Sequence, residues 1–502
     1  MKTSGFFFFV LFLIQGWHSS FETNNPIHFS FPPQSTQTDR MAPLRFVLFL
    51  LFSLSASSTL LFPLQPTTTS HPPLHLLRVS SNRSTTRFHH HHHHRPLPLS
   101  PGSDYTLPLS VGQPPLTQTI PVYLDTASDL VWLPCSPFEC ILCENKPPSL
   151  SHFDPKHSPS LPVPCDSPAC SAAHSRTPSR DLCAAAGCSL DDLETCSCSQ
   201  HCPTFYYAYA DGSLLASLLS DRLPLSPHHS FVFGCARSTL AEPIGVAGLG
   251  QGPLSLPAQL PPSPSRSFSY CLPVQHAVGN AQGAGRPGPL ILGRSPPVQG
   301  FAYTPMLHNP RRPYFYYVGL DAVHVGQRRI AAPPELRRLD RKGGGGLVVD
   351  SGSTFTVLPP GFRRKIVSEF ERGVGFERAK WVEDETGMGP CYYMRTATKD
   401  VEERSRFNKI GALWIPKVGF QFKGNVTLDL PTDNYFMRFD VRGRERVGCL
   451  LLLGGSQEER GGPAGILGNY QQQNFEVVYD TEGKRLGFAP RQCTDLWDDL
   501  HA

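Results

Sequence analysis

Residues 122–134 (VYLDTASDLVWLP) decide the fold, because a second version of this stretch occurs at residues 347–359 (LVVDSGSTFTVLP). Each stretch has three apolar or aromatic residues, an Asp, a hydroxyl residue, a small residue and a Ser, and each ends in Leu-Pro. A second matching pair, residues 247–250 (AGLG) and 465–468 (GILG), follows in the same order at similar spacing. Matching motifs in one order indicate an internal repeat. The sequence therefore predicts two lobes of related design.

Each copy of the repeat places an Asp after a short apolar run. Such a run is typical of a buried strand, and the small and hydroxyl residues after it are typical of a tight loop. Asp125 and Asp350 are therefore expected on loops at the ends of two core strands. If the lobes face each other the carboxylates meet, and two like charges at hydrogen-bond distance cannot both ionise easily. A pair that shares one proton can activate a water for general acid/base hydrolysis without a covalent intermediate.

Further motifs accompany the loops DTAS (125–128) and DSGS (350–353), namely residues 209–213 (YADGS) and residues 468–480 (GNYQQQNFEVVYD). Together they resemble the pepsin-like aspartic proteases, and the chain looks like the plant nepenthesin-type, or atypical, branch of that family. The resemblance covers roughly residues 100–497. It implies an all-β, bilobal fold with two related β lobes, a catalytic cleft between them and few short helices.

The resemblance also implies roles for the residues of the two loops. Asp125 and Asp350 would form the catalytic dyad. Ser128 and Ser353 would hydrogen-bond the outer carboxylate oxygens and fix their orientation.

Thr126 and Ser351 would tie the two loops together across the lobe interface. Gly352 occupies the small-residue position of the second loop, where the first loop has Ala127 instead of the family's usual glycine. Alanine keeps the backbone N–H that helps to hold the carboxylate. If the loop needs a positive φ, alanine would cost about 1 kcal/mol or more, and otherwise its cost is mainly steric. The protein is therefore expected to retain activity with alanine at position 127.

Residues 205–212 (FYYAYADG) form an aromatic run that leads into an Asp-Gly turn, which is a strong signal for a β-hairpin. By resemblance this hairpin is the flap that closes over a bound peptide. Tyr209 stands where the flap tyrosine belongs, and Trp132 matches the aromatic residue that supports it. An ordinary hairpin and a simple core tryptophan are the alternative interpretations.

Fifteen cysteines are present, and ten of them lie within residues 135–202. Close cysteine pairs can bind zinc, but a chain with a secretory start favours a disulfide framework. The odd total leaves at least one thiol free or paired outside the chain, and the spacing does not reveal the connectivity. No metal and no cofactor are expected.

Two apolar segments open the chain, and each has the positive start and the short apolar core of a signal peptide. The preferred interpretation is that translation begins at Met41. The competing one is a genuine first signal followed by a second apolar stretch, which is a candidate membrane anchor. Residues 89–94 are six histidines in a Pro, Ser and Thr-rich region, for which a disordered low-complexity propeptide is favoured over a metal site. By resemblance this propeptide implies a zymogen.

The predicted organisation is an upstream extension, a signal peptide, a propeptide, an N-terminal lobe with a cysteine-rich insertion, and a C-terminal lobe. In order these cover residues 1–40, 41–58, 59–100, 101–300 with the insertion at 135–202, and 301–497. Apolar residues at four-residue spacing also predict a helix over 362–372.

The net charge of +4, with 17% charged residues, gives no indication of a nucleic-acid partner. The expected partners are protein or peptide substrates, and a monomer without a stable membrane anchor is expected. Asn82 and Asn425 begin glycosylation sequons, of which Asn425 is the better candidate. The predicted location is extracellular or vacuolar, reached through the secretory pathway.

The leading functional hypothesis is a secreted or vacuolar aspartic endopeptidase. The alternative is a catalytically weak or inactive binding protein that resembles the plant xylanase inhibitors on the same fold. A glycosidase is disfavoured, because its paired carboxylates usually stand about 5 Å or more apart.

Overall fold

The structure is a computed structural model. The predicted upstream extension and signal peptide lie outside the residues that it describes. The described residues are 60–66, 73–86, 105–143, 151–195, 198–209, 212–241, 243–260, 266–274, 286–294, 299–394, 415–441, 445–455 and 462–501.

Strands dominate the first lobe. β2 (Tyr105–Val111) alternates buried and more exposed residues, as expected for a strand with one face on the core, and it pairs with β3 (Gln118–Asp125). β3 runs parallel to β9 (Gly245–Gly248), which is also antiparallel to β4 (Val131–Ile141). β4 in turn runs parallel to β8 (Ser226–Leu240). The strands on either side of the first Asp loop, β3 and β4, therefore both pair with β9.

The second lobe repeats this arrangement. β16 (Leu347–Val349) runs parallel to β24 (Gly465–Leu467), as β3 does to β9. β17 (Thr356–Leu358) is antiparallel to β24 and parallel to β23 (Leu452–Gly454), as β4 is to β9 and β8. The sequence repeat is therefore a repeat of structure, and the predicted all-β, bilobal fold is confirmed.

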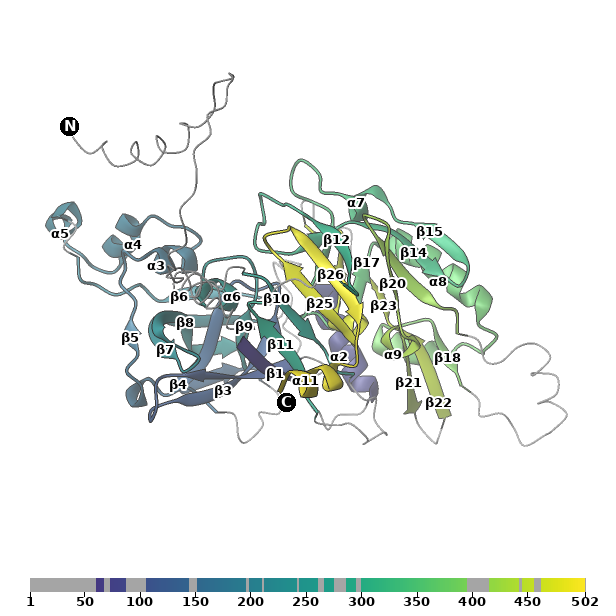
Figure 1. The fold of residues 1–502 in the computed structure, drawn as a ribbon, viewed down its shortest axis with the longest axis horizontal. Coiled ribbons are helices and arrows are strands. Elements are labelled where there is room, and N and C mark those ends of the chain that lie inside the picture. The colour runs from purple at the N-terminus through teal and green to yellow at the C-terminus, as the bar shows by residue number, and fades with distance from the viewer. Residues whose placement is uncertain are drawn as a thin grey trace, which may run out of the picture. The chain divides into compact units, whose positions relative to one another are not determined.

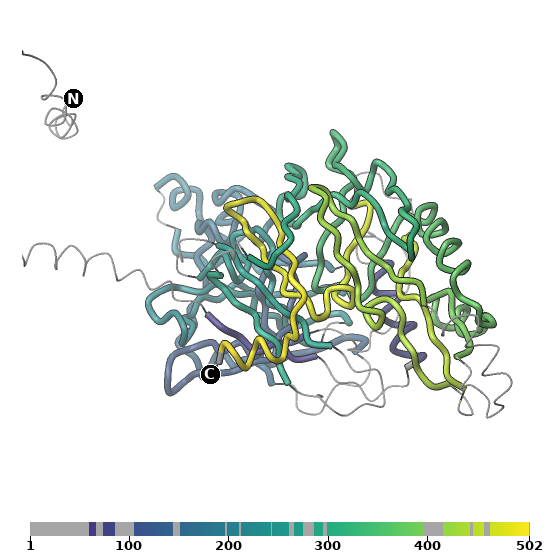
Figure 2. The backbone as a smooth tube through the Cα atoms, turned by 45° about the vertical axis from the view of Figure 1, so that its right-hand side comes forward, coloured from purple at the N-terminus to yellow at the C-terminus, as the bar shows by residue number. Residues whose placement is uncertain are grey.

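The end of the chain pairs with strands of both lobes. β25 (Phe475–Asp480) pairs with β10 (Phe268–Cys271), and β26 (Arg485–Pro490) pairs with β12 (Ala302–Leu307). Figures 1 and 2 show these last strands, in yellow, between the teal and the green parts of the chain. Among the described strands, nineteen therefore belong to one continuous hydrogen-bonded sheet that runs through both lobes.

Helices are few and short. α8 (Pro360–Gly373) buries Phe362, Ile366 and Phe370, which confirms the helix predicted from their spacing. Two elements lie in the segment expected to be disordered: β1 (Leu60–Pro66) and α2 (Pro73–Thr86).

The expectation of disorder is wrong for these two elements. β1 pairs with β2 and with β11 (Gly288–Leu292), and its Phe62 and Leu64 are buried in the main core. α2 inserts Leu77 into a second core cluster. A few apolar side chains anchored in the lobes order this part of the segment, although its composition alone does not predict a core.

Among the described residues, seven disulfides pair fourteen cysteines, which confirms the disulfide framework. Cys196 lies outside the described residues. Four of the bonds lie within the cysteine-rich insertion, which carries α3 (Pro168–Ala173), α4 (Ser179–Ala185) and α5 (Leu190–Thr195). The bonds are Cys135–Cys235, Cys140–Cys143, Cys165–Cys183, Cys170–Cys202, Cys188–Cys198, Cys271–Cys493 and Cys391–Cys449.

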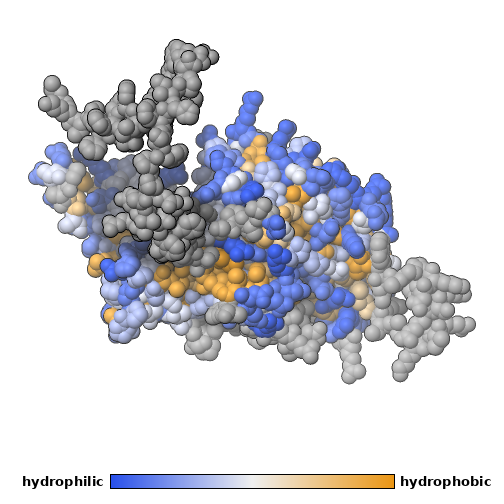
Figure 3. All heavy atoms as spheres, in the orientation of Figure 1, coloured by the Kyte–Doolittle hydropathy of each residue, from blue (hydrophilic) through white to orange (hydrophobic). Residues whose placement is uncertain are grey.

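The surface in Figure 3 is largely polar on the face shown, with hydrophobic residues gathered in a band across its middle. Over the ranges that the structure describes, no helix combines the length and the apolar character needed to cross a bilayer.

Candidate active site

Asp125 and Asp350 occupy equivalent places in the two lobes. Asp125 ends β3 and Asp350 directly follows β16, and their side chains are 4% and 0% exposed. The N–H of Ala127 donates to Asp125 Oδ1 at 2.9 Å, and the N–H of Gly352 donates to Asp350 Oδ1 at the same distance. Each carboxylate is therefore held by the backbone of its own loop. The methyl group of Ala127 does not disturb this bond.

The two serines of the loops differ in their contacts. Ser353 Oγ donates to Asp350 Oδ2 at 2.6 Å, as the resemblance implied. Ser128 Oγ instead lies 3.5 Å from the backbone N and O of Leu130. Ser128 thus bonds within its own loop.

Thr126 and Ser351 join the two lobes directly. The N–H of Thr126 donates to Ser351 Oγ at 3.1 Å, and the N–H of Ser351 donates to Thr126 Oγ1 at 3.0 Å. Each hydroxyl also donates across the interface, Thr126 Oγ1 to Val349 O and Ser351 Oγ to Leu124 O, both at 3.1 Å. The four bonds are equivalent in the two lobes. They fix the spacing of Asp125 and Asp350, which directly precede Thr126 and Ser351.

Glycines of the second motif pair lie against the two loops. A Cβ on Gly248 would stand 2.6 Å from the carbonyl oxygens of Ser128 and Leu130, and a Cβ on Gly468 would stand 2.5 Å from the carbonyl carbon of Phe355. Only glycine lets the backbones approach this closely. The paired glycine motifs therefore set how tightly each Asp loop packs on its neighbouring strand.

The predicted flap is a hairpin of β6 (Phe205–Ala208) and β7 (Ser213–Leu223), closed by a bond from Tyr209 N to Gly212 O at 2.7 Å. Trp132 Nε1 donates to Tyr209 Oη at 2.8 Å, and the indole is fully buried. Burial raises the pKa of Tyr209 well above its usual value. The structure thus brings together the tyrosine and the tryptophan that the sequence analysis paired.

Asp129 and Tyr207 belong to this site but were not singled out from the sequence. Asp129 Oδ1 accepts the N–H of Gly252 at 2.7 Å. Burial raises the pKa of Asp129 to about 6, against the opposing effects of this bond and of Arg176. Burial and the charges of Asp129 and Asp125 likewise raise the pKa of Tyr207. The available signal was the departure from the repeat, since the second copy has Thr354 where the first has Asp129.

Asn425 lies on the turn between β19 (Val418–Phe422) and β20 (Val426–Asp429). Its side chain is exposed, and its Oδ1 accepts a bond from Gln421 Nε2 at 2.9 Å. An exposed turn is accessible to a glycan.

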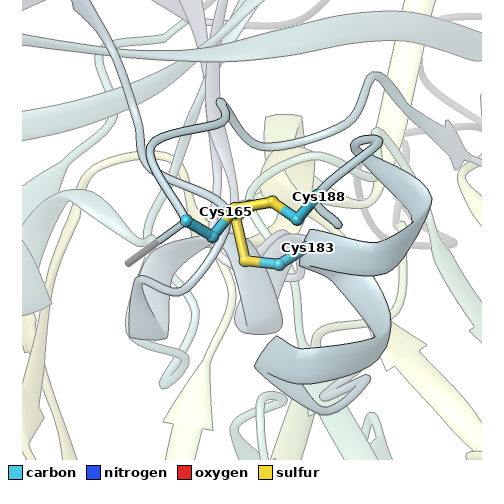
Figure 4. Close-up of side chains that lie close together, drawn as sticks. Cys165, Cys183 and Cys188 are labelled. Atoms are coloured by element: carbon cyan, nitrogen blue, oxygen red, sulfur yellow. Dashed lines mark hydrogen bonds between the residues drawn. A yellow bond between two sulfur atoms is a disulfide. The ribbon is translucent and has the colours of Figure 1, made fainter. Parts of the chain in front are cut away.

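Two groups of side chains in the insertion have ligand atoms close enough for a metal ion. One is Cys165, Cys183, Cys188 and Cys198, and the other is Cys170, His174 and Cys202. Figure 4 shows the sulfur atoms of Cys165, Cys183 and Cys188 gathered at one point. Every cysteine in both groups is disulfide-bonded. Zinc needs thiolate sulfur, so these residues do not fit a metal site while the disulfides are formed.

Comparison with known proteins places this geometry in a family. Residues 105–294 match the family model described as xylanase inhibitor N-terminal, and residues 315–490 match the xylanase inhibitor C-terminal model. An Arabidopsis thaliana protein named a probable aspartyl protease is 48% identical over 443 residues, which is 80% of this chain and 85% of that protein. The chain belongs to the plant pepsin-like aspartic protease family.

Further similar proteins share less sequence identity with the chain. Aspartic proteinase nepenthesin-2 of Nepenthes gracilis is 27% identical over 400 residues, 78% of each chain. Among solved structures, basic 7S globulin from soybean superposes with a TM-score of 0.53 at 18% identity, over 88% of this chain and 99% of that one. Conglutin gamma from lupine seeds has a TM-score of 0.52 at 17% identity, over 88% and 98%. The similarity to these two structures shows a shared fold.

Proposed function

We propose that the chain is a secreted or vacuolar aspartic endopeptidase, in which a water held between Asp125 and Asp350 attacks the peptide bond. The observation that carries the proposal is the pair of equivalent Asp loops bonded to each other through Thr126 and Ser351. Each Asp directly precedes a member of that bonded pair. Membership of the aspartic protease family supports the same conclusion.

In the proposed reaction the two carboxyl groups share one proton, because two adjacent negative charges repel. One Asp takes a proton from the water while the water oxygen bonds to the carbonyl carbon. The other Asp donates its proton to the carbonyl oxygen. Collapse of the tetrahedral intermediate breaks the C–N bond and transfers a proton to the leaving amine. The products are a carboxylic acid and an amine. Closure of the flap over the substrate would exclude bulk water.

The conformation of the first loop supports retained activity with Ala127. Neither Ala127 nor Gly352 is among the described residues with a positive φ, so the alanine carries no strain of that kind. Its methyl group packs at the edge of a small hydrophobic cluster from the second lobe that contains Phe315, Tyr317 and Val348. The methyl therefore occupies a contact between the lobes and leaves the carboxylate bond in place.

We also propose that the chain is made as a zymogen. Helix α2, in the predicted propeptide, reaches residues next to both Asp loops. Ser84 Oγ accepts the N–H of Phe355 at 3.0 Å, and the guanidinium of Arg83 lies 6.0 Å from the ring centroid of Tyr123. A helix held there would hinder access of a peptide to the dyad. The disulfides fit an oxidising compartment, and a glycan on Asn425 would fit the same route.

The binding-protein alternative rests on the description of the matching family models as xylanase inhibitor domains. A protein of that kind needs the fold but no working dyad. Substitution of an Asp of the dyad would therefore abolish the function of an endopeptidase but not that of a binding protein.

The test is cleavage of a denatured protein at about pH 3 to 5 by the acid-treated chain, with and without a statine-type inhibitor. Asp125→Asn should abolish inhibitor-sensitive cleavage, whereas Asp440→Asn, the same change at an exposed ion pair, should leave it intact. No cleavage by the wild type after confirmed removal of the propeptide would contradict the endopeptidase proposal and favour the binding protein.

A further inference from the structure

A cavity of about 900 Å³ lies beside the first Asp loop. Several parts of the chain that are distant in sequence line it. The first Asp loop and the flap contribute Ala127, Asp129 and Tyr209, the insertion contributes Arg176, and the second lobe contributes Arg311 and Arg312. Ala127 donates its N–H to Asp125, so the cavity adjoins the dyad.

The segment that carries Arg311 and Arg312 is held firmly. Both backbone N–H groups donate to Oδ1 of the buried Asn309, at 3.1 and 3.2 Å, and Asn309 Nδ2 donates to Gly343 O at 2.8 Å. Gln251 of the first lobe binds the same segment further on, through Nε2 to Phe315 O at 2.8 Å. The backbone that carries Arg311 and Arg312 is therefore fixed where these residues line the cavity.

Arg176 comes from the turn that follows α3. Its backbone N–H donates to Ser171 O at 2.8 Å, and its φ of 67° is unusual for a residue with a side chain. The Cys170–Cys202 disulfide ties α3 to the chain just before the flap strand β6. The insertion thus carries a cation to the edge of the cavity, close to the flap.

The charges that face the cavity are unbalanced. Within the described part of the chain, none of these three arginines forms an ion pair with a carboxylate. The facing acid is Asp129, and the other titratable groups are the phenols of Tyr207, Tyr209 and Tyr314. Because burial raises the pKa of Asp129 to about 6, it is mostly uncharged at the acidic pH where a singly protonated dyad works. The cavity is then positively charged.

We propose that this cavity is a substrate subsite for a carboxylate, which Arg176, Arg311 and Arg312 bind on one side of the scissile bond. The carboxylate is either an Asp or Glu side chain of the substrate or the C-terminal carboxylate of a peptide. Arginine suits this ligand because its planar fork can donate two parallel hydrogen bonds to a carboxylate. The subsite rests on the proposed function, because it assigns a specificity to the same cleft.

The experiment compares kcat/KM of the acid-activated full chain at about pH 5 on matched peptides. One set carries Glu or its isostere Gln at successive positions on either side of a fixed scissile bond, and a second set has free or amidated C-termini. A Glu preference on one side alone indicates the side-chain source, and a preference for the free acid indicates the C-terminal source. Equal rates in both sets would overturn the subsite while leaving the endopeptidase intact.

The variants are Arg176→Gln and the double variant Arg311→Gln with Arg312→Gln. Each should lower kcat/KM for the preferred acidic peptide by about tenfold and leave the neutral peptide within about twofold. Arg180→Gln is the matched control, because Arg180 is an exposed arginine of the same insertion outside the cavity lining. An equal loss on acidic and neutral peptides would show a structural role instead and contradict the proposal.

Binding separates failure of the subsite from failure of the proposed function. Affinities are measured by fluorescence polarisation for peptides with a non-cleavable reduced bond, in Glu and Gln forms. If no peptide is cleaved, the endopeptidase proposal fails, yet tighter binding of the Glu form that is lost in the arginine variants would still support the subsite. Equal binding of both forms would overturn it.

Discussion

Thr126 and Ser351 each donate a backbone N–H to the hydroxyl oxygen of the other, at 3.1 and 3.0 Å. Both side chains are fully buried, so no solvent can replace a lost partner. This reciprocal pair is the direct connection between the two loops that carry the proposed dyad. Its removal should therefore affect stability and catalysis together.

Ser351→Ala removes the acceptor of Thr126 N–H and the donor to Leu124 O. We expect the free energy of unfolding to fall by about 1–3 kcal/mol, because buried polar groups lose their partners. Urea denaturation measures this change. Ser110→Ala, which removes one hydroxyl of an exposed Ser–Thr pair, should cost less than about 0.5 kcal/mol. An equal effect of both changes would contradict the account.

Ala127→Gly should change kcat/KM by less than about threefold, because the N–H that binds Asp125 remains and the position has no positive φ. Ala127→Val should lower kcat/KM further, since added methyl groups press on the cluster at Phe315 and Tyr317. Steady-state kinetics on one peptide tests both. A large gain with glycine would show that the methyl group impairs the natural enzyme.

Trp132→Phe removes the donor to Tyr209 Oη while keeping an aromatic ring in the core. We expect kcat/KM to fall by about tenfold, because the flap tyrosine loses its fixed position. The free energy of unfolding should change proportionally less. Tyr209→Phe removes the same bond from the other side and should give a similar loss. Full activity in both variants would remove Tyr209 and Trp132 from the proposed machinery.

Asp129 should make the folded state less stable as the pH rises. Its pKa is raised from 3.8 to about 6, so the folded state binds the proton more tightly than the unfolded state does. This contribution is fully present below pH 3.8 and is lost as the pH rises through about 6, with a total of about 3 kcal/mol. Asp129→Asn should flatten the dependence of stability on pH between about 4 and 6. If stability depended on pH with the same slope in the wild type and in Asp129→Asn, the raised pKa of Asp129 would be contradicted.

Leu77→Ala should speed acid activation of the zymogen, because it removes the buried anchor of α2 and leaves a cavity worth about 2–5 kcal/mol. Arg78→Ala, at an exposed position of the same helix, is the control. The measurement is the time course of propeptide loss after a drop to acidic pH. Identical time courses for wild type and Leu77→Ala would show that α2 does not limit activation.

Much of the fold could be predicted because the chain repeats itself. The strand-loop pattern around Asp125 and Asp350, the flap hairpin and the helix at 362–372 each have a local signal in apolar spacing or turn chemistry. Order in α2 had no such signal, since it depends on contacts with residues of both lobes that are distant in sequence. The disulfide Cys271–Cys493 spans 222 residues and could not be paired from spacing.

The arginine cavity could not be predicted for a related reason. Arg176 lies in a Ser- and Pro-rich stretch of the insertion, and Arg311 lies in a loop of the other lobe. Neither belongs to a recurring pattern, and only the fold brings them to one cavity. Asp129 likewise appears in the sequence as one more acid, and its burial decides its protonation.

The most direct test of the central claim is the activity of Asp350→Asn beside that of the wild type on one denatured protein at about pH 4. Asp350 and its three loop neighbours make the contacts described above, and asparagine keeps the size of the side chain while removing its proton chemistry. The account predicts inhibitor-sensitive cleavage by the wild type and none by the folded variant. Cleavage at the wild-type rate by Asp350→Asn would contradict it.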